Sequence, residues 1–113
     1  MGYEAETRAA ALLEQAGFTI LERNFRCRLG ELDIIARRGA LLVIAEVRLR
    51  SRADYGGAAQ SITGVKRARI VRTARYLLCV RPALASLAVR FDALLLSAPD
   101  GAIEWIPCAF EAR

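Results

Sequence analysis

Histidine is absent from the 113 residues of this sequence. Without an imidazole, the chain cannot form a Ser-His-Asp triad or a Cys-His pair, and it cannot use histidine as the general base of a nuclease. If the protein is an enzyme, carboxylates and a metal ion must therefore carry the reaction.

Cysteine is scarce as well, and long apolar runs are missing. Cys27, Cys79 and Cys108 are widely spaced and lie outside any C-x-x-C pattern, so they predict free thiols rather than disulfides or a zinc site. No apolar run approaches the ~18 residues of a membrane span, and the acidic start lacks the features of a secretory signal. We expect a single soluble, cytoplasmic domain over residues 1–113 that does not enter a membrane.

Charge of one sign dominates the sequence. The chain has 17 lysines and arginines against 12 acidic residues, which gives a net charge of +5. Such a balance favours polyanionic partners. Nucleic acid, and DNA in particular, is the leading candidate partner.

Hydrophobic periodicity predicts an α/β fold. Two segments, 4–16 and 58–80, have apolar positions at helical spacing. The strand-like segments are 18–25, 30–36, 41–50, 89–96 and 103–106. The helix at 58–80 predicts a right-handed crossover that places strand 89–96 parallel to strand 41–50. The expected architecture is thus a mixed central sheet flanked by helices, with the 41–50 strand near its centre.

Two strand-like segments carry carboxylates within apolar surroundings. Strict alternation places Glu31 and Asp33 on one face of strand 30–36, and Leu32 and Ile34 on the other. The same rule puts Glu46 on one face of the next strand. Carboxylates in such apolar runs require a partner or a function, because burying an unpaired charge is costly.

The turn between these segments decides whether the carboxylates meet. Gly39 can take the positive φ of a tight hairpin turn, and a loop of two or four residues brings Asp33 and Glu46 to the same face. Their like charges would repel, and a divalent cation between them would relieve the repulsion. Oxygen ligands favour magnesium, manganese or calcium. The alternative is a solvated sheet end, where both carboxylates are salt-bridged to Arg48 or Arg50.

One arc of the predicted second helix is strongly basic, and no acidic residue occurs from 55 to 91. This arc is either a solvated helix face or a phosphate-binding surface, and the charge imbalance favours binding. The candidate nucleic-acid-binding residues are those of the arc together with one arginine on the face of Glu46: Lys66, Arg69, Arg72 and Arg50. Arg75 continues the arc.

Three other residues have mainly structural interpretations. Asp92 is expected to be a structural partner of an arginine. Tyr55 and Trp105 could stack on bases, but packing within the protein is the preferred interpretation of each.

The combined pattern resembles a known family. The order helix, three strands, helix, strand, with Asp on the second strand and Glu-x-Arg on the third, resembles the restriction-endonuclease-like nucleases and their αβββαβ core. A more specific set of residues resembles the YraN-like family of small bacterial proteins: Gly2-(x)3-Glu6-(x)2-Ala9, Gly17-Phe18, Arg23-Asn24, Gly30-Glu31-Leu32-Asp33, Glu46-Val47-Arg48, Lys66 and Arg90-Phe91-Asp92. This resemblance implies a relation to archaeal Holliday-junction resolvases. The implied function is a metal-dependent endonuclease that hydrolyses DNA phosphodiesters, with branched DNA as a candidate substrate.

The resemblance also implies roles for individual residues. Asp33 and Glu46 would bind Mg²⁺ or Mn²⁺, assisted by the main-chain carbonyl of Val47. Glu6, on the first helix, matches a glutamate that joins the site in the resolvase-like branch, and Glu31 is a further candidate ligand.

Arg48 departs from the nuclease signature, which has lysine at this position. As a catalytic residue, arginine keeps the positive charge, but it is bulkier and cannot act as a neutral-amine base. One alternative is therefore a nuclease-fold module that binds nucleic acid without cleaving it, and another is a protein-interaction domain. A homodimer is a further candidate assembly, because branched DNA presents paired strands to a two-fold symmetric protein.

Overall fold

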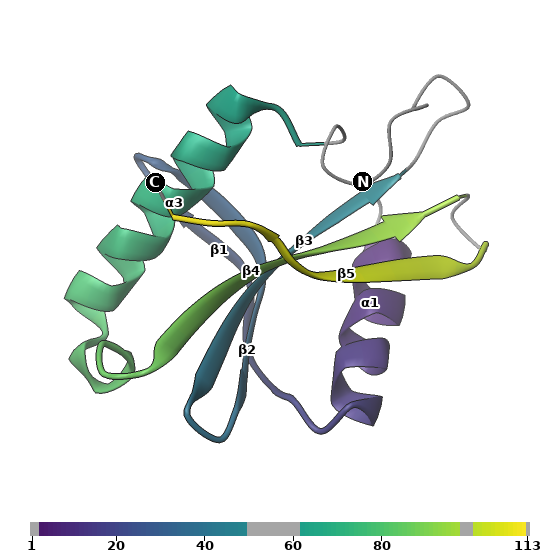
Figure 1. The fold of residues 1–113 in the computed structure, drawn as a ribbon, viewed down its shortest axis with the longest axis horizontal. Coiled ribbons are helices and arrows are strands. Elements are labelled where there is room, and N and C mark those ends of the chain that lie inside the picture. Colours follow the sequence, from purple (N-terminus) through teal and green to yellow (C-terminus); the bar gives the residue numbers. More distant parts are fainter. Residues whose placement is uncertain (1–2, 50–61, 98–100, 113) are drawn as a thin grey trace.

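The computed structural model describes residues 3–49, 62–97 and 101–112, and this part of the chain forms an α/β fold (Figure 1). Its central element is a five-stranded mixed sheet with the strand order β1-β2-β3-β4-β5. In chain order the elements are α1 (Tyr3–Gln15), β1 (Thr19–Cys27), β2 (Gly30–Arg38), β3 (Leu41–Leu49), α3 (Gly64–Val80), the 3₁₀ turn η1 (Pro82–Leu84), β4 (Ala88–Leu96) and β5 (Ile103–Phe110). The predicted fold class is confirmed. No helix of the described ranges has the length and apolar character needed to cross a membrane.

Helices α1 and α3 cover opposite faces of the sheet (Figure 1). On one face α3 contributes Ile70 and Leu77 to a buried cluster, and on the other α1 contributes Ala9 and Leu13. Between them β3 is buried on both sides, which explains why its sequence is continuously apolar. As predicted, β3 is the central strand of the sheet.

The strand connections follow the expected topology. β2 and β3 form an antiparallel hairpin in which Arg38 pairs with Leu41. The two residues between them include Gly39, whose φ of 59° suits a tight turn. β3 and β4 are parallel, from Leu41 opposite Ala88 to the ends of both strands, with α3 as the crossover. β5 pairs antiparallel with β4 at the edge.

Two element boundaries differ from the prediction by more than two residues. The second helix was expected from residue 58, but α3 begins at Gly64, because the side chain of Thr63 caps it by accepting a hydrogen bond from the Lys66 backbone N–H at 3.3 Å. Residues 58–61 lie outside the described part of the chain. The last strand continues to Phe110 rather than ending at Ile106. Its position at the sheet edge tolerates a proline, which has no N–H to donate.

Strict alternation fails within β2. Ile34 packs on the α1 side of the sheet, whereas Leu32, two residues earlier, belongs to the core on the α3 side. The pairing of β2 with β1 places Asn24 opposite Asp33, and Asn24 has a φ of 57°. The alternation of β2 breaks at Asp33, beside this left-handed residue of β1. The expectation that Leu32 and Ile34 share a face is therefore wrong.

Candidate functional site

The candidate site lies where β2 and β3 separate. Their backbone pairing ends at Ile34 opposite Ala45, one position before Asp33 and Glu46 would meet. Beyond this point, the carboxylates of the two side chains accept the hydrogen bonds that backbone carbonyls would otherwise accept. The Asp33 N–H donates to Glu46 Oε2 at 3.4 Å, and the Val47 N–H donates to Asp33 Oδ2 at 2.9 Å. The structure therefore brings the two predicted carboxylates together.

Burial shapes the electrostatics of this pair. Asp33 is 8% exposed and Glu46 is 2% exposed. Burial, together with the nearby charge of Asp33, raises the pKa of Glu46 from its ordinary 4.5 to about 8. Burial also raises the pKa of Asp33, although the Val47 N–H and the charge of Arg48 partly oppose the change. In the folded protein, one of the two carboxyl groups therefore tends to hold a proton near neutral pH.

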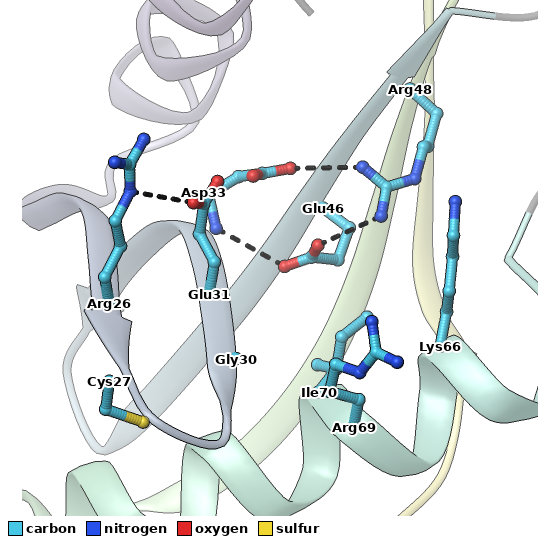
Figure 2. Close-up of a pocket in the computed structure, with 10 residues that line it drawn as sticks. All are labelled: Arg26, Cys27, Gly30, Glu31, Asp33, Glu46, Arg48, Lys66, Arg69 and Ile70. Atoms are coloured by element: carbon cyan, nitrogen blue, oxygen red, sulfur yellow. Dashed lines mark hydrogen bonds and ion pairs between the residues drawn. The ribbon is translucent and has the colours of Figure 1, made fainter.

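Arg48 contacts three of the predicted oxygen ligands: Asp33, Glu46 and the main-chain carbonyl of Val47. Its Nη1 lies 3.1 Å from the carbonyl oxygen of Val47 and 3.6 Å from Asp33 Oδ2. Its Nη2 lies 3.5 Å from Glu46 Oε1. Figure 2 shows the guanidinium pointing between the two carboxylates. These three oxygen groups thus surround a single position that accepts a cation.

Basic side chains from other elements complete a cavity of about 370 Å³ around the carboxylates. Lys66 and Arg69 enter from α3, and Arg26 enters from the end of β1 (Figure 2). Of the predicted nucleic-acid-binding residues that the structure describes, one does not line it. Arg72 is exposed elsewhere on α3, and Arg50 lies outside the described residues, as does Tyr55. The basic arc therefore reaches the site through its first turns only.

Of the two candidate additional ligands, Glu31 lines the cavity and Glu6 does not. Glu31 forms an ion pair with Arg26 at 2.8 Å. Glu6 is buried beside the cavity. It accepts a hydrogen bond from Asn24 Nδ2 at 2.9 Å and pairs with Arg23 at 3.6 Å. Asn24 was part of the motif that resembles the family, but its spacing indicated no role; in the structure its side-chain amide holds Glu6.

Gly30 is a second functional position whose role the sequence did not reveal. A Cβ at this residue would lie 2.8 Å from Thr73 Oγ1 and 2.9 Å from Arg69 Cγ, closer than packed atoms approach. The missing side chain allows α3 to pack tightly against the start of β2. Glycine at this position therefore helps to place Arg69 at the cavity. The glycine was visible in the sequence motif, but its contact with a helix about 40 residues later was not.

A divalent ion fits the oxygen groups of this site. Among the described residues, no three His, Cys, Asp or Glu side chains form a metal-binding group. Two carboxylates and the Val47 carbonyl nevertheless all lie within 3.6 Å of the guanidinium of Arg48. Magnesium commonly takes one or two carboxylates and completes its octahedron with water. The donor set therefore suits Mg²⁺ or Mn²⁺ with several water ligands.

Asp92 has the structural role expected of it. Its carboxylate accepts two hydrogen bonds from Arg90, at 2.8 and 2.9 Å, and one from Trp105 Nε1 at 2.9 Å. Trp105 also packs edge-on against Phe18, with ring centroids 6.0 Å apart. Packing within the protein, the preferred interpretation of Trp105, is confirmed.

The fold and the site define an α/β protein whose five-stranded mixed sheet is compatible with a restriction-endonuclease-like core. Comparison with known sequences gives its family. The model of the uncharacterised protein family UPF0102 matches residues 5–96, so the chain belongs to this family. The YraN-like resemblance agrees with this membership.

Relatives in this family match almost the whole chain. It is 50% identical over 111 residues to a UPF0102 protein of Dechloromonas aromatica, covering 98% of this chain and 88% of the relative. A UPF0102 protein of Nitrosomonas europaea is 47% identical over 111 residues, with 97% and 92% covered. One from Azorhizobium caulinodans is 48% identical over 110 residues, with 97% and 82% covered.

Proposed function

We propose that this protein is a nuclease that depends on Mg²⁺ or Mn²⁺ and hydrolyses phosphodiesters in DNA, with branched DNA as a candidate substrate. The observation that carries the proposal is the burial of Asp33 and Glu46 side by side where two strands separate, within a cavity that also contains Lys66 and Arg69. Burial raises the pKa of both carboxylates, and the charge of Asp33 raises that of Glu46 further. Buried groups with perturbed pKa values cluster at functional sites.

The proposed roles follow from position. Asp33, Glu46 and the Val47 carbonyl would hold the ion, which when bound supplies Lewis-acid activation of water and of the phosphate oxygens. Lys66 and Arg69 approach from the opposite wall of the cavity. They would contact the phosphates on either side of the bond to be cleaved. The site thus combines an anionic centre for the metal with a cationic wall for the nucleic acid.

Cleavage of labelled duplex, single-stranded and four-way-junction DNA, with Mg²⁺, Mn²⁺ or EDTA, tests this function. Asp33→Asn and Glu46→Gln keep the shape of each side chain and remove its charge, and each is expected to lower the rate by about 10² to 10³. Glu14→Gln removes an exposed carboxylate on α1 and is the matched control. Cleavage that survives both site substitutions would reject the mechanism.

One observation favours a second function. Arg48 occupies the place of the usual lysine and is paired with both carboxylates. This arrangement suits a module that binds nucleic acid and has lost hydrolysis. Such a module would show salt-sensitive binding without metal-dependent turnover. Activity that is gained only in Arg48→Lys would identify it.

A further inference from the structure

The side chain of Arg48 and a divalent ion would need the same oxygen atoms. Its guanidinium lies 3.1 to 3.6 Å from the Val47 carbonyl, Asp33 Oδ2 and Glu46 Oε1. Magnesium binds its oxygen ligands at about 2.0–2.1 Å. An ion bound to these oxygens would come within a few Å of the guanidinium, where two cations repel strongly. The two therefore exclude each other from this position.

We propose that Arg48 is an intramolecular competitor of the divalent ion and that it sets the metal affinity of this site. The inference rests on the proposed function, because it takes Asp33 and Glu46 as metal ligands. Both ion pairs that these carboxylates make within the described residues are with Arg48. Metal binding therefore requires this guanidinium to leave.

The surroundings of Arg48 allow such a movement. Its side chain is 26% exposed and lines the open cavity, so it can rotate towards solvent. Its Nε is buried and has no hydrogen-bond acceptor, so the paired arrangement leaves one donor of the guanidinium unsatisfied. Once displaced, the guanidinium still lies at the open side of the cavity, where phosphate oxygens of the nucleic acid can accept its hydrogen bonds.

Lysine at position 48 would compete less well with a divalent ion for these oxygen atoms. Its ammonium is a compact point charge, whereas the planar guanidinium reaches three oxygen groups at once through two nitrogens. Arg48→Lys keeps the charge and removes this geometry, and Arg48→Met removes both. Comparison of the two variants therefore separates competition between Arg48 and the metal ion from the effect of net charge on metal binding.

Binding of Mn²⁺, measured by titration calorimetry and by the spin resonance of the free ion at one fixed pH, tests the proposal. We expect Arg48→Lys and Arg48→Met to bind Mn²⁺ about tenfold or more tightly than the wild type. Arg37→Met removes an exposed positive charge near the other end of β2, outside this cavity, and is the matched control, with an expected change below about threefold. The double variant Asp33→Asn/Arg48→Lys should lose the tight binding, which would locate it at this site.

Unfolding in urea provides a second measurement on the same proteins. Without Mn²⁺, Arg48→Met should be less stable than the wild type, because both carboxylates lose their cationic partner. Saturating Mn²⁺ should restore much of this loss. If Arg48 were merely structural, Mn²⁺ would not reduce the difference between the two proteins.

The possible outcomes separate this inference from the proposed function. Equal Mn²⁺ affinity in the wild type and both Arg48 variants overturns the competition but leaves a metal-dependent nuclease standing. Tighter binding in the variants without cleavage of any DNA supports the competition and rejects hydrolysis. Failure of all the proteins to bind Mn²⁺ overturns both.

Discussion

Replacement of Glu46 by glutamine should stabilise the protein at neutral and alkaline pH. Burial and the charge of Asp33 raise the pKa of Glu46 from 4.5 to about 8. As the pH rises through 4.5, the unfolded chain releases this proton while the folded protein keeps it, so folding stability falls until about pH 8. At about 1.4 kcal/mol for each pH unit, the loss over this window is on the order of 5 kcal/mol. Glutamine cannot ionise, so Glu46→Gln should not show this loss of stability.

The assay is urea denaturation of the wild type and Glu46→Gln in EDTA at several values between pH 5 and pH 9. The readout is the change with pH in the difference between the two free energies of unfolding, because lost contacts of Glu46 shift this difference equally at every pH. We expect the difference to move in favour of Glu46→Gln by several kcal/mol between pH 5 and pH 8. Glu14→Gln, at an exposed position, controls for the loss of one carboxylate. A difference that stays constant with pH would refute the burial argument.

Three further predictions concern the residues that support the site and the fold, and each is measured by urea denaturation. Asp92→Asn should lower the free energy of unfolding by about 3 kcal/mol, because Arg90 loses its buried partner; a loss below about 1 kcal/mol would contradict this role. Gly30→Ala should cost about 1–3 kcal/mol by forcing α3 away from β2, and it should also weaken DNA binding, whereas unchanged stability would show that the helix adjusts freely. Thr63→Ala should cost about 1 kcal/mol through loss of the α3 cap, and Thr63→Ser should retain most of the stability.

Local patterns in the sequence were sufficient to predict the fold class and the central hairpin. The apolar run of β3 indicated a strand covered on both faces, and Gly39 indicated the tight turn. Together they implied that Asp33 and Glu46 meet, because the register of a hairpin follows from the length of its turn. The strand, the turn and the hairpin register depend on neighbouring residues only, so they could be predicted from the sequence.

The remaining features of the site depend on contacts between distant segments. The side-chain alternation of β2 breaks at Asp33, beside the left-handed Asn24 of β1, and period-two alternation cannot anticipate such a break. The close approach of α3 to Gly30 joins two segments that are far apart in the sequence. Alternation and helical spacing describe single elements, so they could not reveal which part of the basic arc reaches the cavity.

Asp92 shows how a buried carboxylate with a structural role is held in this protein, and it can be compared with Glu46. Asp92 is fully buried and accepts four hydrogen bonds of 2.8–3.0 Å, two of them from a guanidinium. Glu46 is almost as buried, but its contacts with the Asp33 N–H and with Arg48 are 3.4 and 3.5 Å long. Its raised pKa indicates that these contacts stabilise the charged form less than water does. A carboxylate with a purely structural role would gain from the closer partners that Asp92 has. The loose contacts of Glu46 instead suit a group whose charge is neutralised by a bound cation, which is the reason to test this site with metal before any other.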